Sequence, residues 1–445
     1  MKRIYGIALA AVLAAPAARS SGRSPQQQPP VFRAGTDVVQ VDVVVHDKSG
    51  RFVPDLKQED FEVSEEGKPQ KIELFYVVGA DETGTPAQAP PVTPSQPAKT
   101  PPVVFPHTPR LFVVVFDDDH LSPAGFKRVQ AAAISLFEKD FKQGDVGGVV
   151  AGGRMVNNRL TTERKELLEA VRSAKPSTHA RSRLIDEREW PRMTLTEAVQ
   201  IRTNADRMVL EAVSLRACQD DPDACRRVDP TESIMEKAAR MTVEANTETD
   251  ATLRTLAVLM NGLGRFQGRK SVLLLTEGFM AEESWPIVGQ AVGLAARANA
   301  TIYTLDARGL DSHDMADQLT RSDPGALDAA SRLLNQLDEG SDAMNSLAVD
   351  TGGFVVRNEN IFDQAVARIA DDASHYYVLG YRPDKAPDGK FRKISVKVNR
   401  PGVTVRARKG YVAAPRPAAT TESARLKPGA PSDTPRAPSD APTPS

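Results

Sequence analysis

The chain has 445 residues, which at about 150 residues per domain is too long for a single small module. Its 57 basic and 58 acidic side chains nearly cancel, so no overall field would concentrate nucleic acid or anionic membranes, and no nucleic-acid partner is expected. Two cysteines are too few for a disulfide scaffold or a tetrathiolate metal site. The 33 prolines are too many for compact structure throughout.

The first 17 residues have the pattern of a signal peptide. A basic start, Met1-Lys2-Arg3, precedes an apolar run and the small residues Ala15-Pro16-Ala17, which a signal peptidase accepts. The run is short for a bilayer-spanning helix, and no later stretch approaches about 20 apolar residues. We therefore expect a secreted or periplasmic protein that does not span the membrane after signal cleavage. An uncleaved N-terminal anchor is the alternative.

Export also bears on the two cysteines. In an oxidising compartment Cys218 and Cys225 could close a small loop, for which the six intervening residues suffice. Two free thiols on a mobile insertion are the alternative.

Proline-rich stretches divide the chain. Residues 79–108 are predicted to be a linker and residues 414–445 a disordered tail, because neither can hold a helix or a central strand. Between the signal peptide and the linker, residues 31–78 alternate apolar and polar side chains between turns. This pattern predicts a small β-sandwich-like module of antiparallel strands.

Residues 109–373 show a different pattern, in which continuous apolar strands alternate with amphipathic helices. It predicts an α/β domain with a doubly wound, mostly parallel, Rossmann-like sheet flanked by helices. The expected strands are Leu111 to Phe116, Val146 to Ala151, Ser271 to Leu275, Thr301 to Leu305 and Phe354 to Arg357. A polar helical insertion is expected at about 176–248. Antiparallel strands in residues 374–413 either extend the sheet or pack with the first module.

Carboxylates follow two of these strands. The first strand ends in Asp117-Asp118-Asp119 and a later one ends in Thr276-Glu277, and ligands of such sheets bind beyond the carboxyl ends of the strands. Clustered carboxylates suit a hard divalent cation. The alternative is that Ser122 caps a helix with Pro123 at its first position, and that the aspartates complement the helix dipole.

Several segments in this order resemble the von Willebrand factor type A family, in particular an exported bacterial group of acidobacterial type. The resemblance extends from Phe32 to Ala413. It rests on these segments: Val53-Pro54-Asp55-Leu56, Glu59-Asp60-Phe61-Glu62-Val63, Glu66-Gly67-Lys68-Pro69, Phe116-Asp117-Asp118-Asp119, Gly268-Arg269-Lys270-Ser271-Val272, Thr276-Glu277-Gly278-Phe279, the run from Ile302 to Leu310, Thr351-Gly352-Gly353, the run from Tyr376 to Tyr381, and Lys409-Gly410-Tyr411.

The resemblance implies a metal-ion-dependent adhesion site that binds protein ligands. The family pattern is Asp-x-Ser-x-Ser after the first strand, a Thr from a later loop and an Asp after the fourth strand. This sequence keeps Asp117 but has Asp119 and Leu121 in place of the serines, and Glu277 in place of the second aspartate. The site is therefore degenerate. The expected ligand set for Mg²⁺, Mn²⁺ or Ca²⁺ is Asp117, Asp119, Ser122, Thr196 and Glu277, with Thr194 as the other candidate threonine.

Catalytic motifs are absent from the sequence: no nucleophile elbow, zincin helix, phosphate loop or dinucleotide fingerprint is found. His120 as a general base with Ser122 as a nucleophile would make a hydrolase, but a capping or solvated histidine is the simpler interpretation. Arg308 is expected to pair with an edge carboxylate. The basic residues Arg400, Arg406, Arg408 and Lys409 are interpreted as a solvated face rather than an anion-binding patch.

These observations predict a non-enzymatic exported protein that mediates protein–protein or surface interaction, as in cell adhesion. Its partner would be an unknown protein or cell-surface ligand. A structural envelope protein without metal dependence is the alternative, and a hydrolase using the His120 cluster is the third.

Overall fold

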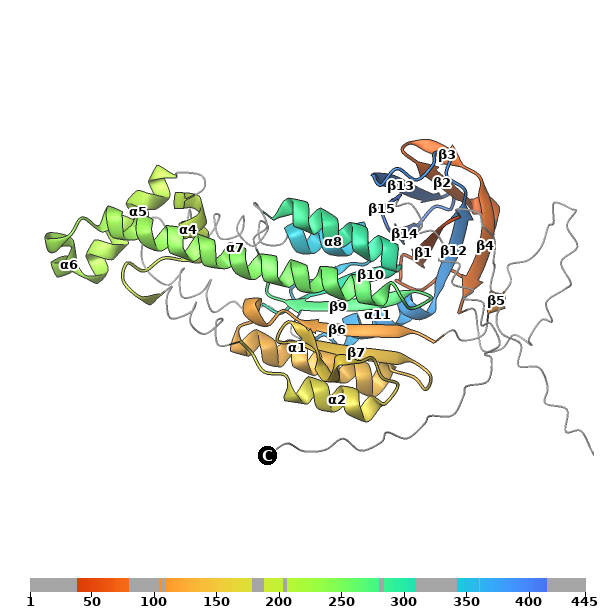
Figure 1. Cartoon of the computed structure of the whole chain (residues 1–445), viewed down its shortest axis with the longest axis horizontal. Helices are drawn as coiled ribbons and strands as arrows, with labels where there is room; N and C mark the ends of the chain where they lie inside the picture. Colours follow the sequence, from red (N-terminus) through yellow and green to blue (C-terminus); the bar gives the residue numbers. More distant parts are fainter. Residues whose placement is uncertain are drawn as a thin grey trace, which may run out of the picture. The chain divides into compact units, whose positions relative to one another are not determined.

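The computed structural model describes residues 38–79, 104–105, 109–177, 188–202, 206–279, 284–308, 342–359 and 361–413. The expected signal peptide, the tail and most of the expected linker lie outside these residues. The described part is a mixed α/β structure with one mostly parallel sheet and two further sheets (Figure 1).

The mostly parallel sheet has six strands in the order β11-β10-β9-β6-β7-β8. Among the described strands of this sheet, only the short edge strand β8 runs antiparallel to its neighbour. The strands are β6 (Leu111–Phe116), β7 (Val146–Ala151), β8 (Arg154–Met155), β9 (Lys270–Thr276), β10 (Ala300–Asp306) and β11 (Val355–Val356). The order reverses between β6 and β9, because the chain continues from β6 towards β7 and from β9 towards β10. A ligand-binding crevice is expected at such a switch point.

Helices cover both faces of this sheet, which explains its nearly continuous apolar strands. One face packs against α1 (Pro123–Ser135), its π-helical continuation η3 (Leu136–Asp140), α2 (Arg164–Ser173) and α11 (Asp363–Ser374). The other face packs against α7 (Pro230–Leu263) and α8 (Trp285–Ala298). Figure 1 shows α7 and α8 on the side of the sheet opposite α1 and α2.

Helix α7 also carries the helical insertion. It begins at the N-cap Asp229 with Pro230 at its first position, and its 34 residues form one continuous helix. Its first half packs against α4 (Leu195–Arg202) and α5 (Arg207–Asp220). Its second half packs on the parallel sheet. The insertion boundary expected at residue 248 therefore falls inside a helix, because the apolar stripe of α7 continues through it.

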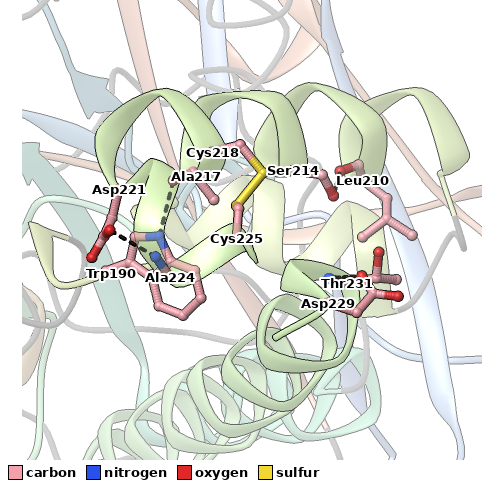
Figure 2. The surroundings of a disulfide bond; sticks show 10 residues. All are labelled: Trp190, Leu210, Ser214, Ala217, Cys218, Asp221, Ala224, Cys225, Asp229 and Thr231. Carbon is pink, nitrogen blue, oxygen red and sulfur yellow. Dashed lines mark hydrogen bonds between the residues drawn. A yellow bond between two sulfur atoms is a disulfide. The ribbon is translucent and has the colours of Figure 1, made fainter. Parts of the chain in front are cut away.

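A disulfide closes the tip of the insertion. Cys218 near the end of α5 is bonded to Cys225 in α6 (Pro222–Arg227), and their Cα atoms are 5.4 Å apart. Asp221 caps α6 by accepting a hydrogen bond from the Ala224 amide. Trp190 donates its indole hydrogen bond to the Ala217 carbonyl beside the bond (Figure 2). The bond fixes the turn between two helices that have few residues to bury.

Strands from both ends of the chain form the other two sheets. The five-stranded sheet has the order β14 (Val403–Ala407), β1 (Val39–Asp47), β12 (Tyr376–Tyr381), β4 (Ile72–Val78), β5 (Val104–Phe105). The four-stranded sheet has the order β15 (Gly410–Val412), β13 (Phe391–Val398), β2 (Phe61–Glu65), β3 (Lys68–Gln70). Their shared core includes Val43, Phe61, Leu379 and Ile394, so the two sheets form a sandwich.

This pairing shows how the C-terminal strands are used. β12 lies between β1 and β4, so the strands of residues 374–413 pack with the first module and do not extend the parallel sheet. The N-terminal strands are therefore not a self-contained module. β5 lies within the expected linker, where it pairs with β4 as an edge strand. An edge position between prolines is one of the few places where such a sequence can form a strand.

Candidate functional site

Asp117 lies at the switch point, directly after β6, and the residue is 3% exposed. Thr252 of α7 donates a hydrogen bond to its Oδ1 at 2.6 Å, and Thr276 at the end of β9 donates to its Oδ2 at 2.7 Å. His120 Nδ1 lies 2.9 Å from Oδ1. Both carboxylate oxygens are thus bonded to side chains from three separate parts of the chain.

These contacts determine the ionisation of Asp117. Burial alone would raise the pKa of this carboxyl, but the neighbouring His120 and the hydrogen bonds from His120, Thr252 and Thr276 hold the pKa below its usual value. The carboxylate is therefore charged at neutral pH. Its charge is compensated by donors that the protein itself provides.

Ser122 and Glu277 form a second contact across the switch point. The Ser122 hydroxyl donates to Glu277 Oε1 at 2.5 Å and accepts the Gly125 amide at 3.1 Å, so Ser122 is also the N-cap of α1. A Cβ atom at Gly125 would stand 1.9 Å from Glu277 Oε1, so only glycine permits this close approach. Burial raises the pKa of Glu277, although the hydrogen bond from Ser122 opposes the shift.

The two following aspartates lie in the short helix η2 (Asp118–His120) and have different environments. Asp118 is buried; its Oδ2 accepts the Gly152 amide at 2.6 Å, and its Oδ1 has no hydrogen-bond partner among the described residues. Burial raises the pKa of Asp118 to about 7, with Asp117 and Asp119 adding to the shift. Asp119 is half-buried.

Arg308 follows β10 and pairs with Asp306, the last residue of that strand. This is the pairing with an edge carboxylate that was expected for Arg308.

The structure brings together four of the five expected metal ligands in one region, but not the threonine. Thr196 lies in α4, which packs against the first half of α7 around Ile234 and Met241. Thr252 lies eleven residues after Met241, which at 1.5 Å per residue places it about 16 Å further along α7. Thr194 instead bonds with Glu197 at the start of α4. The threonine at Asp117 is Thr252, and the prediction of Thr196 is wrong.

A divalent cation does not fit these residues as they are arranged. Among the residues that the structure describes, no group of three or more His, Cys, Asp or Glu side chains is placed to hold a metal ion. More directly, Asp117 gives both oxygens to protein donors, and the Ser122 hydroxyl donates to Glu277. Leu121, where the family pattern has a serine, is fully buried and offers no oxygen.

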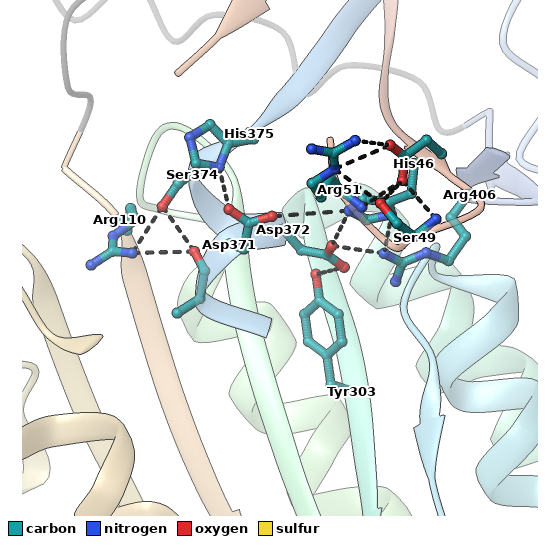
Figure 3. Close-up of polar contacts among 12 residues, drawn as sticks. His46, Ser49, Arg51, Arg110, Tyr303, Asp371, Asp372, Ser374, His375 and Arg406 are labelled. Carbon is teal, nitrogen blue, oxygen red and sulfur yellow. Dashed lines mark hydrogen bonds and ion pairs between the residues drawn. The ribbon is translucent and has the colours of Figure 1, made fainter. Parts of the chain in front are cut away.

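A second polar cluster, which we call the Asp372 cluster, was not anticipated. Asp372 at the end of α11 is 0% exposed and accepts from Arg406 of β14 at 2.7 Å and from Tyr303 of β10 at 3.4 Å. His46 of β1 lies 3.5 Å away. Figure 3 shows Asp372 between these side chains, with Asp371 and His375 beside it. The cluster joins the parallel sheet to the sandwich.

Sequence reasoning missed Thr252, Thr276 and the Asp372 cluster. Thr252 had one detectable signal, because it is a polar residue on the apolar stripe of α7, next to Leu253 and Leu256. Thr276 adjoins Glu277, whose carboxylate carries the prediction for this segment. The members of the Asp372 cluster come from four distant segments, and no local pattern connects them.

Comparison with known proteins gives no match: no family model fits the chain, and no curated protein or solved structure is significantly similar to it. Within the described ranges, no helix is both long and apolar enough to cross a membrane.

Replacing Thr252 with valine tests the Asp117 network. The substitution keeps the shape of the side chain but leaves a buried carboxylate without one donor, which costs about 1.5–3 kcal/mol for a hydrogen bond to a charged group. We expect Thr252→Val to lower the free energy of unfolding by this amount in urea denaturation at neutral pH. Thr247→Val is the matched control, because Thr247 is exposed on the same helix. Equal losses for both variants would contradict the network.

The raised pKa of Asp118 predicts a pH-dependent stability. Below about pH 4 the Asp118 carboxyl is protonated in both the folded and the unfolded chain, so its burial costs little free energy of folding. Between pH 4 and 7 the unfolded chain ionises while the folded one stays protonated, so stability falls as pH rises, and it stays lower above pH 7. Asp118→Asn should gain stability over wild type across this window, reaching about 2–4 kcal/mol.

The measurement is urea denaturation of wild type, Asp118→Asn and Asp223→Asn at a series of pH values. Asp223→Asn serves as the control, because it removes an exposed carboxyl of α6. A difference between Asp118→Asn and wild type that does not change with pH would show that Asp118 ionises normally.

Proposed function

We propose that this chain is an exported binding protein of von Willebrand factor type A kind, which docks a protein or cell-surface ligand at the carboxyl edge of its parallel sheet. The observation that carries the proposal is that the adjacent strands β6 and β9 are followed by Asp117 and Glu277, where Thr276 donates to Asp117 and Ser122 donates to Glu277. Open α/β sheets bind their ligands at this place. The contacts of Asp117, Ser122 and Glu277 tie the two loops into one fixed surface.

Docking at this edge does not use a cation in our proposal. The family's adhesion site needs oxygens that are available to an ion, whereas Asp117 is engaged by Thr252, Thr276 and His120. Asp119 and the Asp306–Arg308 pair, which is partly exposed, provide charge at the edge. A ligand would meet this surface through hydrogen bonds and ion pairs rather than by completing a metal shell.

A non-enzymatic role is favoured over hydrolysis. The contact between Asp117 and His120 Nδ1 has the form of a carboxylate orienting a general base. However, the Ser122 hydroxyl donates to Glu277 and accepts from Gly125, so it is not paired with His120. A buried Asp–His pair without a hydroxyl nucleophile is better explained as part of the folded edge. A purely structural envelope role would require that this edge have no ligand.

Export is supported by two independent features. The first 17 residues have the composition of a signal peptide. The bonded cysteines Cys218 and Cys225 suit an oxidising compartment such as the periplasm or the cell exterior. The proposed location is therefore outside the cytoplasm.

The proposal predicts that a charge reversal at the edge abolishes ligand capture. Immobilised mature protein is exposed to a cell-envelope extract, and retained proteins are compared between wild type, Asp119→Lys and Asp223→Lys. Asp223 is an exposed residue of α6 in the insertion and serves as the matched control. Proteins retained by wild type and control should be lost, about tenfold or more, from Asp119→Lys. Identical retention by all three would refute docking at the edge.

A further inference from the structure

A second concave surface lies at the edge strand β11, which β10 and β9 separate from the switch point. It is an open pocket of about 470 Å³. Phe354 and Arg357 flank β11, Arg368 comes from α11, and Arg406 comes from β14. Three arginines from three parts of the chain therefore line one pocket, and Glu359 is the acidic residue among its lining.

Two of these arginines share one aromatic ring. The guanidinium carbon of Arg368 is 3.8 Å from the centroid of Phe354, and that of Arg406 is 4.8 Å from the same centroid. The ring attracts each cation but does not neutralise its charge. Burial lowers the pKa of Arg368 and the neighbouring Arg406 adds to the shift, whereas Asp372 and Glu359 oppose it.

Arg406 presents an unused donor in this region. Its Nη2 donates to Asp372 at 2.7 Å, on the side of the Asp372 cluster. Its Nη1 is buried and has no acceptor within hydrogen-bond distance among the described residues. A buried donor without an acceptor is costly, since it loses its bond to water. Asp372 neutralises part of the charge of Arg406, and Arg357 and Arg368 bring further positive charge to the pocket.

We infer that this pocket binds a phosphate group. The three guanidinium groups come from separate parts of the chain and can meet a tetrahedral group from several directions, whereas one arginine is enough to match a planar carboxylate. The volume exceeds that of free phosphate, so a small phosphate monoester fits the same site.

The test is isothermal titration of the mature protein with inorganic phosphate at constant ionic strength. Arg368 is the residue to change, because Arg406 also bonds to Asp372 and its loss could unfold the cluster. We expect one phosphate site in wild type and about tenfold or more weaker binding in Arg368→Gln. Arg368→Lys should have an intermediate affinity, because lysine keeps the positive charge but loses the paired N–H donors of the guanidinium group. Arg154→Gln, an exposed arginine on β8, should bind like wild type.

Parallel titrations identify the source of the phosphate group. Tighter binding of glycerol 3-phosphate than of inorganic phosphate, with no binding of glycerol, supports a phosphate monoester; equal or weaker binding supports the free ion. Tighter binding of acetate than of phosphate would overturn the assignment. Wild type that does not bind millimolar phosphate, or Arg368→Gln that binds as well as wild type, would overturn it too. None of these outcomes depends on the docking edge at β6 and β9.

Discussion

The buried carboxylate of Asp117 connects the parts of the chain on which the proposed edge depends. A charged carboxylate that is withdrawn from water must be matched by donors, and here they come from α7, from the end of β9 and from the loop after β6. The loops at the switch point therefore cannot move independently. The same hydrogen bonds that permit burial of the charge also hold the edge in one geometry.

Helix α7 connects the buried carboxylate of Asp117 with more distant parts of the structure. One end of the helix packs in the disulfide-closed insertion and the other on the parallel sheet, with Thr252 in between. The insertion is thus continuous with an element that contacts the candidate site. On the other side of the molecule, Asp372 ties α11 to strands β1 and β14 of the sandwich. Two buried aspartates, each with several donors, hold the main layers together.

Much of the parallel sheet could be predicted from sequence because its strands are buried on both faces. β6 and β7 have the expected bounds, since a short apolar run between polar residues leaves little choice. Tertiary pairings were less accessible. The place of Thr252 on the apolar stripe of α7 indicates that it is buried, but not that it bonds to Asp117. Arg406, expected on a solvated face, is bonded to Asp372. Such contacts depend on how distant elements pack, which periodicity does not encode.

The most direct test of this account is thermal unfolding of the mature protein with and without Mg²⁺, Mn²⁺ or Ca²⁺, beside Asp117→Asn. An ion that binds only the folded state at about 100 times its Kd adds about 2.7 kcal/mol, which a melting curve detects. Because protein donors occupy Asp117, we predict that no ion shifts the melting temperature of either protein. A clear increase in wild type that disappears in Asp117→Asn would contradict the account and establish a metal site at the edge.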